Sequence, residues 1–205
     1  DTTNFQVAHI YADNQVPYSL SPIPTFAVSA QLVDSKGGSA SANTAATVMN
    51  VAPTVNFTVA PSTGPEGTTF KIGGVVVDPG ILDYQTVTIN WGDGSPAVVL
   101  NFAPNGTTTH TFEYTHAYPD NVVPNVPDNN LPFTITITAK DSSKGADGNL
   151  YPDLGEATTS NTAIVPNAAP TITGLAVAGG GLIMAGSPIT LTGTITDPGI
   201  LDYQD

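Results

Sequence analysis

The chain has 205 residues, 40% of them hydrophobic, which is enough for one large domain or about two small ones with packed cores. Four Lys, no Arg and 17 acidic residues give a formal net charge of −13, which argues against nucleic-acid partners because like charges repel. Cysteine is absent, which excludes disulfides and thiol chemistry. The sequence contains no run of 18 apolar residues, so direct membrane insertion is not expected.

The composition predicts an all-β protein. Thr, Val, Ile, Tyr and Phe are prominent, 20 Gly and 18 Pro recur between them, and no stretch keeps an apolar period of 3.6 residues.

Three internal matches divide the chain. Residues 9–14 and 26–34 match 116–121 and 133–141 at one offset of 107 (116 − 9 and 133 − 26). Residues 47–55 match 164–172 at an offset of 117 (170 − 53), because the later copy gains about ten residues in a loop near 146–155. Residues 78–85 and 197–204 are identical, at an offset of 119 (197 − 78).

We therefore expect three units. Residues 1–50 form the back part of one repeat, 51–168 a complete repeat and 169–205 the front part of another, so that the sequence looks like a window from a longer array. Proline in the joints 51–53 and 168–170 stiffens them, as a rod requires, and 119–132 is predicted to be a long loop.

The complete repeat has the pattern of a two-sheet sandwich. Seven strands are predicted: Thr54–Val59, Thr68–Val77, Thr86–Trp91, Ala97–Phe102, Thr107–Tyr114, Phe133–Lys140 and Ala157–Val165. Alternation predicts that Thr134, Thr136 and Thr138 face outward. The predicted core comprises Phe70, Ile72, Val76, Val87, Ile89, Trp91, Ile135 and Ile137.

Short motifs stand at set places in this repeat. They are Ala52-Pro53, Asp78-Pro79-Gly80, Trp91-Gly92-Asp93-Gly94, His116-Ala117-Tyr118 and Asp141 before a turn with Gly145. Together they resemble the PKD-like repeat, despite Ala117 where a hydroxyl residue is usual and expanded loops after Tyr118 and Asp141. The resemblance implies tandem immunoglobulin-like β-sandwiches with about seven strands each, in bacterial extracellular or cell-surface proteins, and a non-catalytic spacer, adhesion or structural role.

Catalysis is not expected. The imidazoles are His9, His110 and His116, and the first and last occupy the same position in successive repeats, which favours a packing role. Trp91 shares the inward phase of Val87 and is interpreted as a core residue, with a sugar-stacking platform as the alternative. Asp93 is expected to accept backbone hydrogen bonds in its hairpin turn.

The acidity has two interpretations, surface solubility and divalent-cation binding. An immunoglobulin-like topology places Asp78, Asp83, Asp141 and Asp147 at the pole beside the preceding joint, and the Asp93 turn and the 120–128 loop at the opposite pole. Because calcium requires oxygen ligands, we hypothesise a loop or inter-domain calcium site at Asp78, Asp83 and Asp141. The alternative is that Asp78 and Asp83 only cap turns around Pro79-Gly80.

Asn56-Phe57-Thr58 and Asn105-Gly106-Thr107 fit the N-glycosylation pattern, so glycans on Asn56 and Asn105 are a further hypothesis.

Two functions compete. The leading hypothesis is a structural module of a long extracellular repeat protein, a stalk, sheath or filament whose partners are neighbouring copies of the repeat. A variant is assembly between chains by exchange of the partial repeats, although neither contains a counterpart of 86–107. The alternative is a targeting or adhesion module attached to a secreted enzyme or a surface adhesin, which predicts an exposed aromatic row.

Overall fold

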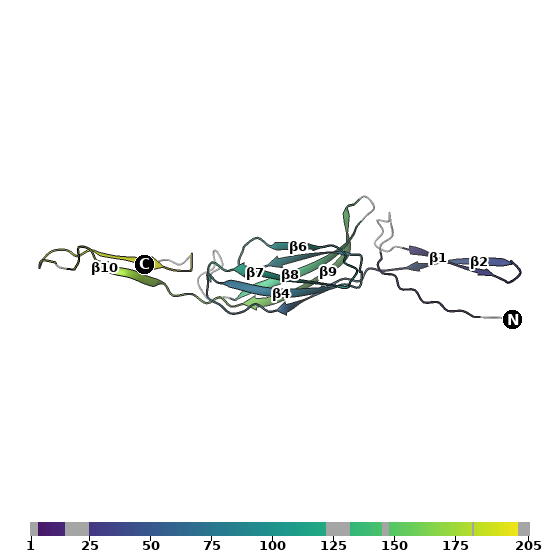
Figure 1. Ribbon diagram of the computed structural model, residues 1–205, viewed down its shortest axis with the longest axis horizontal. Helices are drawn as coiled ribbons and strands as arrows, with labels where there is room; N and C mark the ends of the chain where they lie inside the picture. The colour runs from purple at the N-terminus through teal and green to yellow at the C-terminus, as the bar shows by residue number, and fades with distance from the viewer. Residues whose placement is uncertain (1–3, 15–24, 122–131, 145–147, 182, 201–205) are drawn as a thin grey trace.

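The computed structural model describes residues 4–14, 25–121, 132–144, 148–181 and 183–200, and every regular element in these ranges is a β-strand. No helix in them is long and apolar enough to cross a membrane. A seven-stranded sandwich lies between two hairpins, and the three parts follow one another along one axis (Figure 1). We name the sandwich, β3 to β9, the central sandwich.

The central sandwich consists of two antiparallel sheets. One sheet has the order β3-β4-β7 and the other has the order β6-β5-β8-β9. This arrangement confirms the predicted all-β, immunoglobulin-like sandwich. The strands are β3 (Thr54–Val59), β4 (Thr69–Val77), β5 (Tyr84–Asn90), β6 (Val98–Phe102), β7 (Thr109–Ala117), β8 (Phe133–Lys144) and β9 (Leu150–Ala163).

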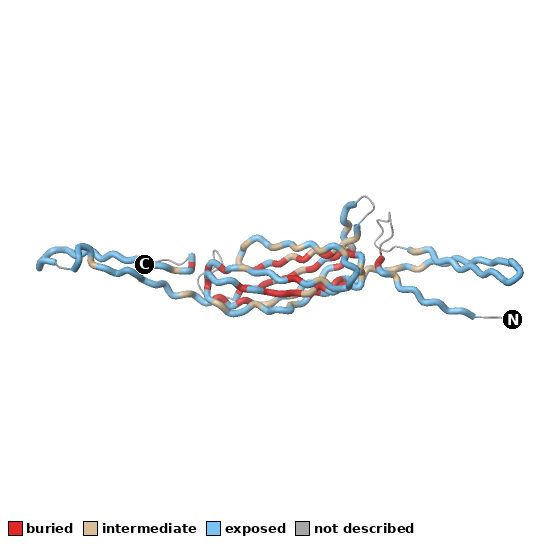
Figure 2. Tube along the Cα trace, viewed as in Figure 1, coloured by how far each residue is buried: buried red, intermediate tan, exposed pale blue. Residues whose placement is uncertain are grey.

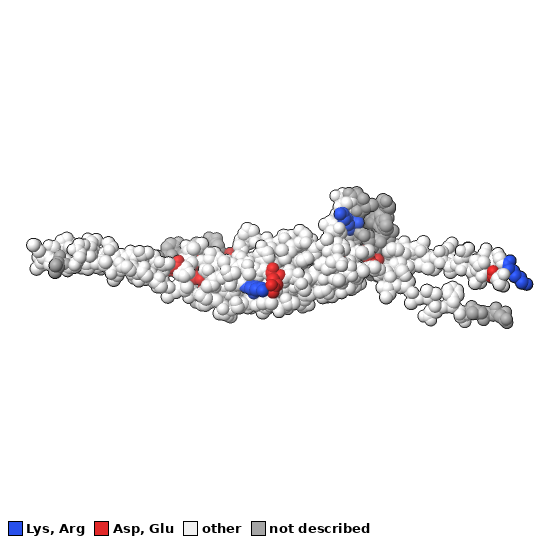
Figure 3. Space-filling model, viewed as in Figure 1, with Lys and Arg blue, Asp and Glu red and all other residues white. Residues whose placement is uncertain are grey.

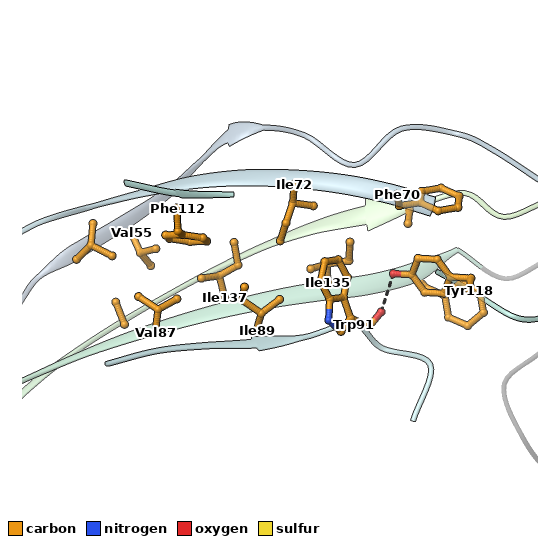
Figure 4. Close-up of a cluster of buried hydrophobic side chains, with 14 of the residues drawn as sticks. Val55, Phe70, Ile72, Val87, Ile89, Trp91, Phe112, Tyr118, Ile135 and Ile137 are labelled. Carbon is orange, nitrogen blue, oxygen red and sulfur yellow. Dashed lines mark hydrogen bonds between the residues drawn. The ribbon is translucent and has the colours of Figure 1, made fainter. Parts of the chain in front are cut away.

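The core lies between the two sheets (Figure 2). All eight predicted core residues are buried, together with Val55, Phe112, Tyr118, Phe133, Ala139, Ala163 and Val165. Figure 4 shows side chains of the two sheets pointing toward one another, with Phe70 and Ile72 on one side and Ile135 and Ile137 on the other. Gly74 pairs with Phe112 across β4 and β7, and a Cβ at Gly74 would collide with the Phe112 ring, so the missing side chain makes room for it.

The β8–β9 hairpin differs from its prediction. Residues 146–155 are predicted as loop, yet β9 begins at Leu150, which pairs with Lys144, and Pro152 pairs with Ser142. The hairpin therefore extends beyond the predicted strand ends, because ladder pairing satisfies its backbone donors and acceptors. The register shifts between Lys140 and Ser142, where Asp141 lies.

Both flanking hairpins repeat pairings of the central sandwich. In β1 (Thr25–Val33) and β2 (Ser39–Thr47), Phe26 pairs with Ala46, which is the register of Phe133 with Ala163 at offsets of 107 and 117. In β10 (Thr171–Val177) and β11 (Leu191–Thr196), Thr171 pairs with Thr196, as Thr54 pairs with Val77. Most residues of both hairpins are exposed, since no second described sheet covers them (Figure 2).

Candidate functional site

Three carboxylates meet at the end of the central sandwich nearest the joint 51–53, which we name the N-terminal pole. Asp78 directly follows β4 and Asp83 directly precedes β5, so one short loop carries both. The loop is held tightly, because Gly80 N–H donates to Asp78 Oδ1 at 2.8 Å and Asp83 N–H donates to the Gly80 carbonyl at 3.1 Å. A Cβ at Gly80 would collide with the Asp83 carboxylate.

Asp141 reaches the same place from β8. It continues the inward phase of Ile137 and Ala139, and the bulge opposite it in β9 brings Gly155 N–H to 3.0 Å from Asp141 Oδ1. A Cβ at Gly155 would collide with the carboxylate. Its other oxygen, Oδ2, accepts a hydrogen bond of 2.9 Å from Asn50 Nδ2, next to the joint.

The cluster is compact and shielded from water. Asp78, Asp83 and Asp141 are 3%, 2% and 3% exposed, and one oxygen from each lies within 4.8 Å of the other two. Negative charges at this separation repel one another strongly in a buried site, and a shared cation relieves the repulsion. The structure thus brings together all three residues of the predicted metal set.

Gln85 is a fourth member that the sequence reasoning missed. It is 1% exposed, it pairs with Asp141 across β5 and β8, and its Nε2 donates to Asp78 Oδ2 at 2.5 Å. Its Oε1 is buried with no hydrogen-bond partner in the described part of the chain. The available signal was its phase, because Gln85 precedes Val87 and Ile89 on the inward face of one strand.

The N-terminal pole also contacts the segment before it. Ile81, between Asp78 and Asp83, donates its N–H to the Ala12 carbonyl at 3.2 Å. The equivalent residue of the last unit, Ile200, donates to the Pro119 carbonyl at 3.3 Å. The two donors are 119 residues apart (200 − 81) and the two acceptors are 107 apart (119 − 12), which are the offsets of the internal matches. The same backbone contact therefore occurs at both ends of the central sandwich.

At the opposite, C-terminal pole, Asp93 does more than hold its turn. Oδ1 accepts from Ser95 N–H at 3.0 Å, as predicted, and Oδ2 lies 2.7 Å from His116 Nε2. Burial opposes the ionisation of Asp93, but the hydrogen bonds from Ser95 and His116 outweigh it and lower the Asp93 pKa. His116 stacks on Trp91 with ring centroids 4.6 Å apart, so the imidazole and the indole both serve packing.

Tyr118 completes this aromatic group. It is fully buried, and its hydroxyl donates to the Trp91 carbonyl at 3.0 Å (Figure 4). Burial, followed by the negative charge of Asp93, raises the Tyr118 pKa, so the phenol stays protonated and keeps donating. His9 and Tyr11 repeat the edge-on contact of His116 and Tyr118, with centroids 4.6 Å and 4.8 Å apart, consistent with the packing role predicted for the repeated histidine.

Glu66 was also missed. It is 1% exposed, Oε1 accepts from Ala168 N–H at 2.7 Å, and Oε2 accepts from Asn121 N–H at 2.9 Å. One buried carboxylate therefore ties the following joint to the loop after Tyr118. The chain pattern did not reveal this role, because a Glu between Pro65 and Gly67 reads as an ordinary turn residue.

These positions revise the interpretation of the acidity. Six acidic side chains of the described part are buried, namely Asp13, Glu66, Asp78, Asp83, Asp120 and Asp141. The face in Figure 3 carries few charged groups, and most of its surface is uncharged. Surface solubility therefore accounts for only part of the negative charge. Asp128 and Asp147 lie outside the described residues.

Both predicted glycosylation residues are exposed. Asn56 lies within β3, whereas Asn105 lies in the loop between β6 and β7. Asn105 Oδ1 accepts from Thr107 N–H at 2.9 Å and from its hydroxyl at 2.7 Å, which holds the Asn-Gly-Thr sequence in a tight turn.

Comparison with known proteins does not define a family. No protein-family model matches the chain, and no curated protein matches it. Among solved structures, it is similar to the solution NMR structure of a CARDB domain from Pyrococcus furiosus, at 10% identity and a TM-score of 0.30, covering 56% of this chain and 94% of that one.

Proposed function

We propose that this chain is a non-catalytic structural module, one stretch of a rod in which PKD-like immunoglobulin-like sandwiches stack end to end. Its partners are neighbouring copies of the same repeat, and its place is outside the cell or on the cell surface of a bacterium. The observation that carries the proposal is the duplicated contact, Ile81 to Ala12 and Ile200 to Pro119. A joint that recurs with the same donor and acceptor generates a regular array.

The joints have further supports. Asn50 is tied to Asp141 at one end, and Ala168 is tied to Glu66 at the other. Asp13 and Asn14 are buried although their unit is otherwise largely exposed, which supports close docking of the units at Ala12. Side-chain bonds across both joints favour a stiff connection over a flexible tether.

Pulsed electron paramagnetic resonance tests the rod. The chain has no cysteine, so Lys36→Cys at the tip of the first hairpin and Thr111→Cys on β7 provide two unique, exposed labelling sites. We expect a narrow distance distribution that broadens when Ala52 and Pro53 are both replaced by glycine. A broad distance distribution in the parent protein, equal in width to that of the glycine variant, would refute the rod.

Assembly between chains remains part of the proposal. Both hairpins expose large apolar side chains, including Leu32, Ile172 and Leu175, and such surface favours pairing with the complementary half of another sandwich. Size-exclusion chromatography and electron microscopy separate a monomer from a fibre.

The targeting alternative has no comparable support. It requires a row of exposed aromatic rings, whereas the large hydrophobic residues exposed in the described ranges include two aromatics, Phe5 and Tyr114, which belong to different units. Glycans on Asn56 and Asn105 are compatible with an extracellular rod, and the intact mass of protein from its natural source tests for them.

A further inference from the structure

We propose that Asp78, Asp83, Asp141 and Gln85 form a calcium site, and that bound calcium stiffens the joint to the preceding unit. The role in the joint rests on the proposed rod, whereas the binding itself does not.

The spacing of the carboxylates suits calcium. Calcium takes six to eight oxygen ligands at about 2.3–2.6 Å, so two ligands on opposite sides of the ion lie about 5 Å apart. One oxygen from each of Asp78, Asp83 and Asp141 lies within 4.8 Å of the other two. One ion therefore reaches all three carboxylates, and it replaces their mutual repulsion by attraction.

Gln85 supplies an independent observation. Its amide lies at the cluster, because Nε2 donates to Asp78 Oδ2, and its side chain is almost completely buried. The Oε1 of this amide has no hydrogen-bond partner in the described ranges, although burying an amide oxygen without a partner is unfavourable. A turn of this amide exchanges the places of its nitrogen and oxygen, so an ion among the carboxylates can give Oε1 a partner.

The type of ligand selects the ion. Every side chain in the set offers oxygen, which suits calcium or magnesium, whereas zinc prefers histidine nitrogen and cysteine sulfur. Magnesium demands a near-ideal octahedron at about 2.0–2.1 Å and keeps several of its waters. A buried set of three carboxylates and an amide, drawn from a loop and two strands, fits the larger and less demanding ion better.

The same residues connect the ion to the joint. Asp78 and Asp83 flank Ile81, whose N–H donates to Ala12 of the preceding unit. Asp141 accepts from Asn50 beside the joint. Calcium that draws these carboxylates together fixes the loop between Asp78 and Asp83, and a fixed loop holds Ile81 against Ala12.

Calorimetric titration of the chelator-treated 205-residue chain with calcium tests the site. We expect one calcium ion to bind per chain. The melting temperature should rise by roughly 10 °C when the free calcium concentration is about a hundredfold above Kd. Asp141→Asn should weaken binding at least about tenfold, because it removes a charged ligand. The matched control is Asp34→Asn, which changes the equivalent residue of the first unit, where Asp34 is exposed and accepts from Lys36 and Gly38 N–H groups. It should leave affinity unchanged.

The titration of the parent protein keeps the test decisive even if Asp141→Asn fails to fold. A titration without heat of binding, together with equal melting temperatures in calcium and in chelator, would overturn the site. Equal loss of affinity in the Asp34→Asn control would overturn its assignment to this cluster. Calcium is further expected to narrow the distance distribution between labels at Lys36 and Thr111, and binding without narrowing would overturn the role in the joint. A broad distribution under all conditions, with calcium bound, would refute the rod and leave the site standing.

Discussion

Replacing Tyr118 by phenylalanine tests how the C-terminal pole is held. The substitution removes a buried hydroxyl that donates to the Trp91 carbonyl at 3.0 Å and keeps the ring contacts with Phe70 and Phe133, whose centroids lie 5.1 Å and 4.6 Å away. Losing this bond and leaving a buried carbonyl unsatisfied should lower the free energy of unfolding by about 1–3 kcal/mol. The urea midpoint should fall by roughly 1–2 M.

Fluorescence of Trp91 reports this change directly, because it is the only tryptophan and is 1% exposed in the folded protein. Tyr114→Phe is the matched control. It makes the same chemical change on an exposed tyrosine of β7 and should shift stability by no more than about 0.5 kcal/mol. Equal midpoints for Tyr118→Phe and the parent protein would refute the reasoning.

The dependence on pH gives a second readout of Tyr118. Its pKa is raised in the folded state, by burial first and by Asp93 second. An unfolded phenol ionises near pH 10, so above that pH the folded state holds the extra proton and its stability falls, by up to about 1.4 kcal/mol per pH unit. The contribution of the protonated Tyr118 to stability is complete below about pH 10 and is lost as the pH rises. Tyr118→Phe should lack this component of the alkaline loss.

Two further predictions concern the turn after β5. Gly92 and Gly94 both have positive φ, but a Cβ at Gly92 would lie 2.5 Å from the Thr134 carbonyl oxygen, whereas none of the neighbouring atoms lies within 4 Å of a Cβ at Gly94. Gly94→Ala should cost about 1 kcal/mol and Gly92→Ala about 2–4 kcal/mol in urea unfolding, and equal costs would contradict the close approach of Gly92 to Thr134. Asp93→Asn weakens the contact with His116 and should cost about 1 kcal/mol at pH 7. Because the folded Asp93 pKa is lowered, the deficit should be full above about pH 4 and vanish as pH falls below it, and a deficit that persists at pH 2 would contradict this.

Local patterns predicted most of the central sandwich. Alternation in Val87, Ile89 and Trp91 identified a strand and its buried face, because side chains on successive residues of a strand point to opposite sides. Residue type also identified the acids near the preceding joint, since an immunoglobulin-like topology brings the loop after β4 and the end of β8 to one pole. Asp78, Asp83 and Asp141 do meet there.

Periodicity along the chain was therefore enough to predict most strand positions and their inward phase. Which polar groups share the interior depends instead on how the strands pack together. Glu66 looks like a surface turn residue in the sequence, and its burial depends on the joint at Ala168, which is distant in the chain. The inward phase of Gln85 can be read from its strand, but its contact with Asp78 depends on packing. The extension of β8 and β9 past Asp141 likewise depends on cross-strand pairing, which composition does not encode. The physical reason is that alternation is a property of one strand, whereas the partners of a buried oxygen are supplied by others.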